Sequence, residues 1–386
     1  MEVLVIGSGM MGTSVVKDLS EADGVTRITA ADRDLSIAQR VKEQWSPAKA
    51  VIEPVQMDLR NASQVVNLMK EHDMVVGTYP ERWALRVTEY VLEAGVDLVD
   101  VTALQGWEER AQMHEQLVSA GITVIPGCGV APGLANILMG IGTERVNHAH
   151  TGKIMVGGLP QSPQPPLDYA VVFSFETVID EYTVSPRIIK NGRIHEMKPL
   201  SGLENVTFES PVGEAECFLT DGLNTLLGTM PKRGLQNVEE KTVRYKGHRD
   251  TMAMLLDCGF FGEEPIEVEG VDGAKVTPRQ VTSSILTPLL QVGDTRDVTC
   301  MRIVVYGDER IQFDMMDYYD DDSEISSMAR TTGYTCSIVA QMLAAGHIDK
   351  KGFLPPEEAI TDKNYGELDE QLKRRGINVI ESWPGD

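Results

Sequence analysis

The first third of the chain alternates short apolar runs, often β-branched, with amphipathic stretches. The apolar runs, between Glu2 and about Pro126, are VLVIG, RITAAD, VIEPVQMD, DMVVGTY, VDLVDVT and ITVIPG. The stretches between them, such as NASQVVNLMKEH and RWALRVTEYVLEAG, carry apolar residues at helical spacing. Strands that alternate with helices predict an α/β fold with a Rossmann-type, doubly wound parallel sheet.

The pattern changes after residue 148. Longer strand-like runs, Gly/Pro turns and few helices continue to about residue 318, which predicts a second unit of α+β type. The stretch ISSMARTTGYTCSIVAQMLAAGHI then predicts a long helix that Gly346 closes.

The charge balance narrows the possible partners. The 386 residues include 35 Lys and Arg against 58 Asp and Glu, a formal net charge of −23. Such a field repels nucleic-acid phosphates and anionic membranes, so we expect neither as a partner. The sequence shows no apolar run long enough to cross a bilayer and no signal-peptide pattern, and we therefore expect a cytoplasmic protein.

Candidate metal sites are weak. The five cysteines stand at least 36 residues apart, so free thiols are expected rather than a zinc site or a disulfide framework. His148 and His150 alternate in a strand-like stretch without an evident third ligand. The acidic run at residues 317–326 lacks the calcium-loop pattern and is read as a solvated turn. No metal is predicted.

The first strand runs directly into a glycine fingerprint, Gly7-Ser8-Gly9-Met10-Met11-Gly12, which opens a helix. In this context Gly7 permits a tight turn, Gly9 lets the backbone approach a pyrophosphate, and Gly12 lets helix and strand pack closely. The amide groups of the helix N-terminus, including those of Met10 and Met11, would receive the phosphates of a dinucleotide.

Asp32 ends the second strand, twenty residues beyond Gly12. An acid there can accept hydrogen bonds from both ribose hydroxyls and repel a 2′-phosphate, which favours NAD over NADP. Arg33 follows at once and could instead accept that phosphate. Asp58, after the third strand, would lie near the adenine or be a surface acid.

Ligands of open α/β sheets gather at the carboxyl ends of the strands. That rule selects three segments to surround the nicotinamide. They hold Gly77, Thr78 and Tyr79 after the fourth strand, Asp100 and Thr102 at the fifth, and Gly129 and Pro132 after the sixth. Asp100 could be catalytic, or could equally cap a helix or bond between domains.

Several segments together resemble the saccharopine dehydrogenase-like family, most closely its lysine 6-dehydrogenases. In chain order they are VLVIGSGMMG, VDLVDVTA, GCGVAPGLANIL, VGGLPQSPQPPLDYAVVFSFE, KTVRYKGH and SMARTTGYTCSIVAQMLAAGHIDKKGFLPPE. One departure is Ala131, where saccharopine reductases tend to carry an acid before Pro-Gly.

The resemblance implies three parts: a Rossmann domain at 1–130, an inserted α+β substrate and dimerisation domain at 131–322, and C-terminal helices at 323–386 that pack back on the Rossmann domain. It also implies NAD-dependent oxidative deamination of the side chain of L-lysine to aminoadipate semialdehyde and ammonia, by a homodimer or higher homo-oligomer. Ala131 favours such a small amine over saccharopine.

An amine dehydrogenase needs a general base with a pKa near the working pH, for which histidine is suited. His248, in Arg244-Tyr245-Lys246-Gly247-His248, is the first candidate, with a structural histidine as the alternative. Arg244 could clamp a substrate carboxylate or form a strand-surface salt bridge. Tyr245 is a further candidate for the substrate site.

A cationic amine also needs a carboxylate or carbonyl partner. Asp168, Glu176 and Asp100 are the candidates, while Tyr169 and Tyr79 could supply a wall and a hydroxyl. Two other functions compete with lysine oxidation. One is a saccharopine, carboxyspermidine or opine-type dehydrogenase that acts on a secondary amine, and the other is a non-catalytic NAD sensor.

Overall fold

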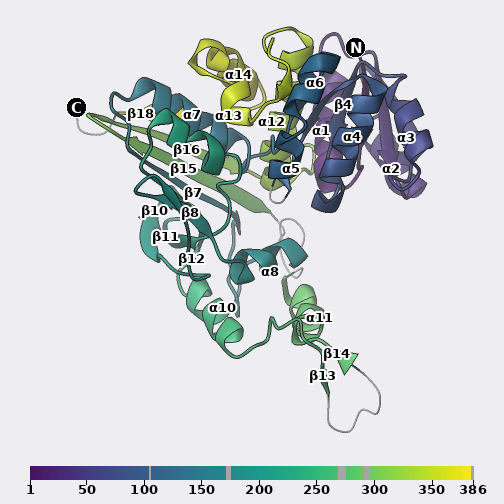
Figure 1. The fold of residues 1–386 in the computed structure, drawn as a ribbon. Coiled ribbons are helices and arrows are strands. Elements are labelled where there is room, and N and C mark those ends of the chain that lie inside the picture. The colour runs from purple at the N-terminus through teal and green to yellow at the C-terminus, as the bar shows by residue number, and fades with distance from the viewer. Residues whose placement is uncertain (104–105, 171–174, 268–274, 291–295, 384–386) are drawn as a thin grey trace.

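The computed structural model describes residues 1–386 except 104–105, 171–174, 268–274, 291–295 and 384–386, and leaves out the side chains of 175–177. The chain forms two halves, each built around one sheet (Figure 1). The Rossmann-type half carries the N-terminus, and the second half ends in a narrow arm that points away from the body.

The first sheet is parallel throughout and has seven strands. Their order across the sheet is β17 (Gly352–Phe353), β6 (Thr123–Ile125), β5 (Asp97–Asp100), β4 (Met74–Gly77), β1 (Glu2–Ile6), β2 (Arg27–Asp32) and β3 (Val51–Gln56). The order reverses at β1, which creates the switch point where doubly wound sheets bind ligands. The predicted α/β fold class is confirmed.

The crossover helices follow from the sequence pattern. They are α1 (Met10–Glu21), α2 (Leu35–Trp45), α3 (Ala62–Met69), α4 (Ala84–Ala94), α5 (Trp107–Ala111) and α6 (His114–Ala120). The side chains of Asp34 and Asn61 cap α2 and α3 by accepting from backbone N–H groups. Gly95 ends α4 with a φ of 77°, a left-handed geometry that suits glycine.

The second sheet is mixed and has nine strands. Seven follow in the order β10 (Glu204–Thr207), β11 (Glu214–Leu219), β12 (Asn237–Tyr245), β7 (Thr151–Pro160), β15 (Asp297–Tyr306), β16 (Arg310–Tyr318) and β18 (Val379–Ser382). A hairpin of β8 (Arg187–Lys190) and β9 (Arg193–Glu196) attaches to β12. The predicted α+β character of this unit matches these elements.

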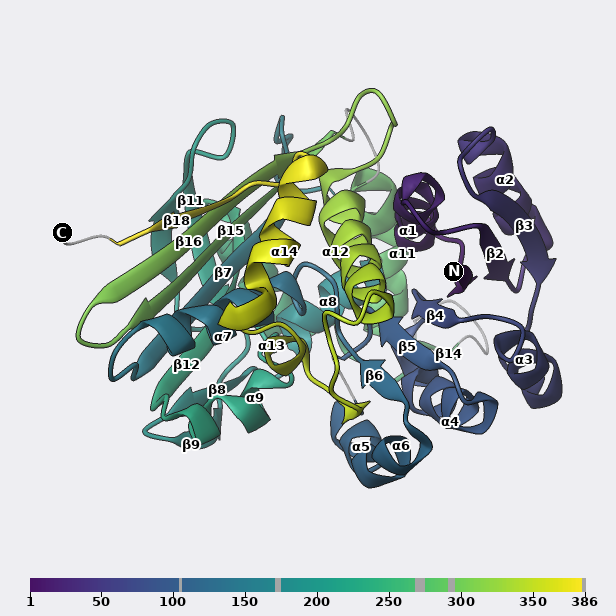
Figure 2. The same ribbon diagram turned by 90° about the horizontal axis from the view of Figure 1, so that it is seen from above.

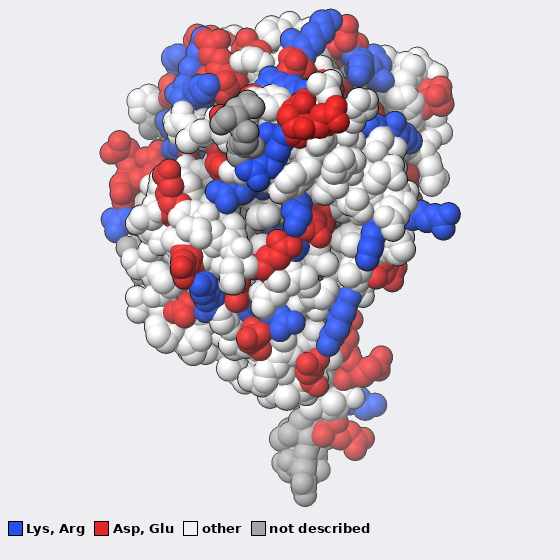
Figure 3. Space-filling view, turned by 90° about the vertical axis from the view of Figure 1, so that its left-hand side faces the viewer, with Lys and Arg blue, Asp and Glu red and all other residues white. Residues whose placement is uncertain are grey.

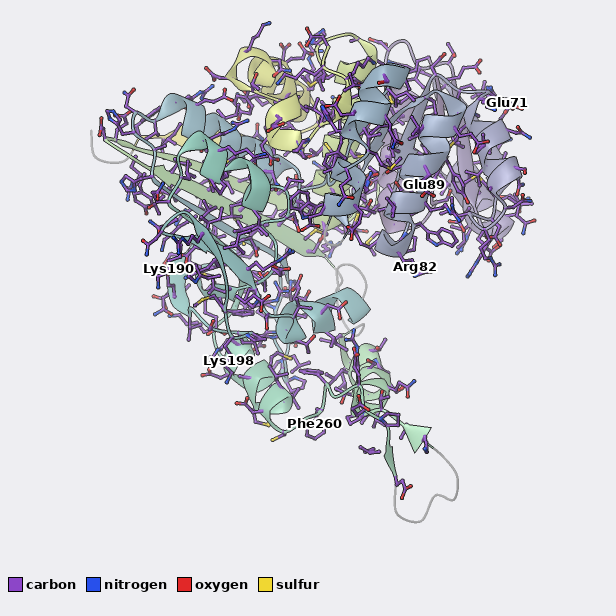
Figure 4. The ribbon with its side chains drawn as sticks, viewed as in Figure 1. Glu71, Arg82, Glu89, Lys190, Lys198 and Phe260 are labelled. Atoms are coloured by element: carbon purple, nitrogen blue, oxygen red, sulfur yellow. The ribbon has the colours of Figure 1, made fainter. Side chains whose placement is uncertain are left out.

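Several helices surround this sheet. They are α7 (Leu134–Arg145), α8 (Phe175–Thr183) and α9 (Leu226–Thr229), with a 3₁₀ turn at Pro231–Arg233. α10 (His248–Asp257) lies below β12, and the arm carries α11 (Pro278–Leu290) and the two-stranded β13 (Ile266–Glu267) and β14 (Lys275–Val276). Phe260, labelled in Figure 4, lies on this arm, far from the Rossmann-type half.

The C-terminal part joins both halves. Figure 2 shows α12 (Ser327–Ala344) between the second sheet and α1. α13 (Pro356–Ala359) packs on α7, and α14 (Asp362–Arg374) packs on α7 and α12. β17 extends the Rossmann sheet, whereas β18 extends the second one. This part therefore packs on both units, not on the Rossmann domain alone. The boundaries at 130 and 322 stay a prediction.

Other features bear on the predicted partners. Within the described residues no three His, Cys, Asp or Glu side chains form a group that could hold a metal ion. No helix in that part of the chain has the length and apolar character needed to span a membrane. Acidic and basic side chains alternate on the face drawn in Figure 3.

Candidate functional site

The glycine fingerprint forms the tight turn that the sequence predicts. Gly7 has a φ of 94°, and a Cβ on Gly12 would stand 1.9 Å from the Gly7 carbonyl oxygen. A Cβ on Gly9 would meet nothing within 4 Å, so the backbone there is open to a ligand. α1 begins directly at Met10, which is half exposed, and continues through Met11. The geometry suits a pyrophosphate on the first amides of α1.

Asp32 lies at the end of β2, beside this turn. Its Oδ2 accepts from the Ser8 backbone N–H at 2.9 Å, and its Oδ1 accepts from the Asp34 N–H at 2.9 Å. The carboxylate is thus fixed next to the glycine turn, at the position of a ribose-binding acid.

Arg33 is exposed, and Asp58 forms an ion pair with Arg60 through several contacts. Hydrogen bonds from Arg60 lower the pKa of Asp58 to about 2. This pairing favours the surface-acid interpretation of Asp58, although Asp58 and Arg33 still flank the open end of β2.

The loop after β4 contacts the glycine turn directly. The Thr78 hydroxyl donates to the Gly7 carbonyl at 2.8 Å. A Cβ on Gly77 would come within 2.8 Å of the Tyr79 ring and of the Asp100 Cβ. Gly77 and Thr78 therefore lie at the carboxyl edge of the sheet, beside the glycine turn, and their contact with a cofactor stays a prediction.

Asp100 and Tyr79 meet in a fully buried polar cluster. The Tyr79 hydroxyl donates to Asp100 Oδ2 at 2.7 Å, and the Thr102 N–H and hydroxyl donate to Oδ1 at 2.9 and 2.8 Å. Arg110, from α5, pairs with the same carboxylate, and both side chains are 0% exposed. Burial and the Asp100 charge raise the pKa of Tyr79 well above its usual value.

This saturation argues against a catalytic role for either residue. Each Asp100 oxygen already accepts at least two hydrogen bonds, and the Tyr79 proton is held by Asp100. The cluster instead fixes the ends of β4 and β5 against each other. The interpretation of Asp100 as a structural hydrogen-bonding acid is the one that this geometry favours.

The loop after β6 folds tightly on itself. The Gly129 N–H donates to the Pro132 carbonyl at 2.9 Å, and a Cβ on Gly129 would stand 3.0 Å from Thr332 of α12. The preceding Cys128 N–H donates to the Asp100 carbonyl at 2.7 Å. Gly129 and Pro132 are therefore held at the same edge of the sheet as Asp100 and Thr102.

A second polar cluster lies on β12 and α8. Arg244 donates to Glu181 at 2.6 Å and, through Nε, to the Tyr182 hydroxyl at 3.2 Å. Its guanidinium lies 4.5 Å from the centroid of the Tyr169 ring. Arg244 is buried and already has a carboxylate partner, so the predicted free carboxylate clamp is not what the structure shows.

His248 is the next member of this chain of contacts. Its Nδ1 donates to the Leu167 carbonyl at 2.9 Å, because a carbonyl can only accept, and Nε2 therefore accepts from the Tyr182 hydroxyl at 2.9 Å. Burial and the Arg244 charge lower the pKa of His248 to about 3. A buried, neutral imidazole with both nitrogens engaged is a poor general base.

The remaining predicted substrate residues differ in their surroundings, and of these Tyr169 lies beside Arg244 and His248. Tyr169 is buried, and its hydroxyl has no hydrogen-bond partner within the described part of the chain. Asp168 has a φ of 49°. Tyr245 follows Arg244 on β12, so its side chain points to the opposite face of the sheet, where its hydroxyl donates to the Pro160 carbonyl at 2.8 Å. Glu176 lies in α8, and its side chain is outside the described residues.

Glu240 belongs to the same face of β12 as Arg244. It is 4% exposed, and its Oε2 accepts from the Thr220 hydroxyl at 2.6 Å. Burial raises its pKa to about 8, and the nearby carboxylates of Glu181 and Asp221 add to this rise.

The loop after β11, which packs beside Glu240, lies close to the Rossmann-type half. Asn136 of α7 donates to Thr225 at 3.2 Å. Arg187, which pairs with Asp221, also reaches Glu108 of α5 at 3.4 Å. The cluster thus borders the elements that follow β5 and β6, at the edge where the strands end.

Six of the residues that form these clusters are absent from the sequence predictions: Arg110, Glu181, Tyr182, Arg187, Asp221 and Glu240. Period-two alternation on β12 places Glu240 on the same face as Arg244, and this signal could have found it. The contacts of Arg110 and of Glu181 and Tyr182 join distant segments, and no local pattern indicates them.

Two family models match the chain. Residues 3–125 match the saccharopine dehydrogenase NADP binding domain, and residues 129–377 match the saccharopine dehydrogenase C-terminal domain. Among curated relatives is the saccharopine dehydrogenase [NADP(+), L-glutamate-forming] of Schizosaccharomyces pombe, 23% identical over 74% of this chain and 63% of the relative. The mitochondrial alpha-aminoadipic semialdehyde synthase of Mus musculus is 22% identical over 97% of this chain and 47% of the relative. The chain spans less than two thirds of the length of these relatives.

Solved structures agree in fold. The apo saccharopine dehydrogenase (L-Glu forming) from Saccharomyces cerevisiae has a TM-score of 0.80 and 21% identity, and the match covers 99% of both chains. A homospermidine synthase from Legionella pneumophila in complex with NAD has a TM-score of 0.64, with 11% identity and coverage of 99% of this chain and 91% of the other. With two domain models matched in sequence over nearly its whole length, the chain belongs to the saccharopine dehydrogenase family.

Proposed function

We propose that the chain is a nicotinamide-dependent dehydrogenase of lysine metabolism that oxidises the side-chain amine of L-lysine to aminoadipate semialdehyde, with release of ammonia. The family and the glycine turn support a dinucleotide-dependent enzyme. The bound dinucleotide would accept a hydride from the aminated carbon. Gly7, Gly9 and the first turn of α1 would hold its pyrophosphate.

One observation carries the choice of substrate. On the described face of β12 and its surroundings, Arg244 is paired with Glu181 and Arg187 with Asp221, which leaves the Glu240 carboxylate in excess. Both substrates carry ammonium nitrogen, but near neutral pH saccharopine with its three carboxylates is a net anion and would need free cations, whereas lysine is a net cation. A cluster with a surplus acid favours lysine.

The second candidate is a dehydrogenation of saccharopine. Its support comes from the two fungal relatives, which are named saccharopine dehydrogenases. We further propose NAD as the cofactor because the fixed Asp32 carboxylate would repel a 2′-phosphate, although the matched family model is described as NADP binding.

A spectrophotometric test separates these candidates. The purified chain is incubated with NAD or NADP and with L-lysine, L-ornithine or saccharopine, and reduced cofactor is followed at about 340 nm, where the reduced nicotinamide absorbs. We expect reduction of NAD with lysine. Reduction with saccharopine but not with lysine would overturn the proposal in favour of the second candidate. If the chain binds dinucleotide but reduces it with none of these substrates, the proposal also fails and a non-catalytic NAD sensor is favoured.

A further inference from the structure

Five charged side chains lie together where β12 meets α8 and the loop after β11. Three are acids, Glu181, Asp221 and Glu240, and two are the arginines 187 and 244. Side chains alternate between the two faces of β12, so Glu239 and Lys241 point to the face opposite Glu240. There Lys241 forms an ion pair with Glu204, and Glu239 forms one with Lys153.

The pairing within this cluster is uneven. Arg244 Nη2 lies 2.6 Å from Glu181, and Arg187 Nη2 lies 2.9 Å from Asp221. Among the residues that the structure describes, Glu240 has no ion-pair partner, and the single hydrogen bond to its carboxylate comes from Thr220. Glu240 is nevertheless buried, with only 4% of its surface exposed. A buried carboxylate without a cation is costly unless it is protonated or a ligand supplies the charge.

We propose that Glu240 binds an ammonium group of the substrate. This inference rests on the proposed function, because it assigns the recognition of the amine to one carboxylate. It also replaces Asp168, Glu176 and Asp100, the acids that sequence reasoning selected for this task.

The surroundings of Glu240 fix the carboxyl group in place. A Cβ on Gly222 would stand 2.6 Å from the Glu240 carboxyl carbon, so the loop after β11 packs directly on the carboxyl group and only glycine fits there. The loop that carries Gly222 is held to α7 through Asn136 and Thr225. Glu240 therefore lies close to the junction of the two halves, where a substrate would meet the bound dinucleotide.

The raised pKa of Glu240 fits the same role. Near neutral pH the empty site would hold a neutral carboxylic acid, which costs less to bury, and an arriving ammonium would favour the ionised form. Binding of the cation would then release a proton from Glu240. Calorimetry in buffers of different ionisation enthalpy would detect this proton.

The central experiment measures the dissociation constant of L-lysine by calorimetry in the presence of NADH. Glu240→Gln keeps the shape of the side chain and removes its charge, and we expect lysine binding at least about tenfold weaker with dinucleotide binding unchanged. Glu239→Gln is the matched control, since it removes the neighbouring charge on the opposite face, and its lysine affinity should stay within about twofold of the wild type.

Two analogues identify which ammonium is bound. L-Norleucine keeps only the α-ammonium, and 6-aminohexanoate keeps only the side-chain ammonium. The analogue whose binding is weakened by Glu240→Gln carries the group that Glu240 recognises, and either result supports the proposal.

The failures are distinguishable. Equal lysine affinity of the wild type and Glu240→Gln overturns the inference alone, as does a parallel loss of dinucleotide binding. If the wild type binds saccharopine but not lysine, the proposed function fails, and the same comparison made with saccharopine, which also carries ammonium nitrogen, still decides the role of Glu240. A wild type that binds neither amine overturns both the proposed function and the role of Glu240.

Thermal unfolding checks that the variant folds. The thermal midpoint of Glu240→Gln at pH 9 should equal or exceed that of the wild type.

Discussion

At the scale of single residues, the carboxylates of the two halves differ in their hydrogen-bond and ion-pair partners. Asp100 is matched by a buried arginine, Asp32 by two backbone N–H groups, and Glu240 by one hydroxyl only. The same side-chain chemistry therefore gives a structural anchor at Asp100, the proposed ribose acceptor at Asp32 and the proposed ammonium site at Glu240. The partners of each carboxylate, more than its place in a motif, indicate what it does.

Replacement of Asp32 tests the cofactor preference. Asp32→Ala removes the acceptor for the ribose hydroxyls and the charge that repels a 2′-phosphate. We expect the dissociation constant of NAD to rise about tenfold and that of NADP to fall, as measured by quenching of intrinsic fluorescence. Glu53→Ala, on the adjoining strand β3, is a suitable control because its carboxylate pairs with Arg27 away from the turn. A variant with unchanged preference would show that Arg33 or another group decides the choice.

His248 gives a prediction about pH. Its folded-state pKa of about 3 lies below the usual value of 6.5, so the unfolded chain binds more protons between these values and stability falls as the pH drops through this window. His248→Gln should abolish this contribution, which amounts to roughly 2 kcal/mol between pH 6.5 and pH 5. Urea unfolding at both pH values measures the difference.

The same variant tests the catalytic prediction. A glutamine can still donate to the Leu167 carbonyl or accept from Tyr182, so we expect the pH profile of kcat/KM for lysine to keep its shape. Loss of the limb that reports the essential base would instead restore His248 as the proton acceptor.

At the scale of elements, the ends of β4 and β5 are joined through the Arg110–Asp100 pair from α5. Arg110→Met would leave Asp100 buried without its cation, and we expect a loss of about 3–5 kcal/mol in the free energy of unfolding. The double variant Asp100→Asn with Arg110→Met should recover part of this loss because no bare charge remains. Urea denaturation of the single and double variants gives the coupling, and additive losses would contradict a direct ion pair.

The elements also show what the sequence alone could predict. The strand ends that carry Gly7, Asp32 and Thr78 follow from local periodicity and from the rule that parallel strands end at one edge. The environment of His248 and Arg244 does not, because it depends on α8, which reaches them across more than 60 residues of sequence. A motif such as RYKGH indicates proximity in the chain, whereas Tyr245 and Arg244 point to opposite faces of β12.

At the scale of the whole molecule, the arm presents an apolar surface that the single chain leaves uncovered. Val281, Ile285 and Leu289 follow each other at intervals of four along α11 and are exposed, while Leu286 and Leu290 on the other side line a cavity of about 10 Å³ beside Tyr182. A helix that is apolar on both sides is unusual at the surface of a monomer. The predicted homodimer would bury this outer side.

Ile285→Asp tests that prediction because Ile285 is 57% exposed and the change adds a charge outside the core of the single chain. We expect the mass measured by sedimentation to fall from that of a dimer to that of a monomer, with a small change in the thermal midpoint of the monomer itself. Val51→Asp places the same charge on β3, at the far edge of the Rossmann sheet, and should leave the assembly intact. If Ile285→Asp sediments as the wild type does, the arm does not form the interface.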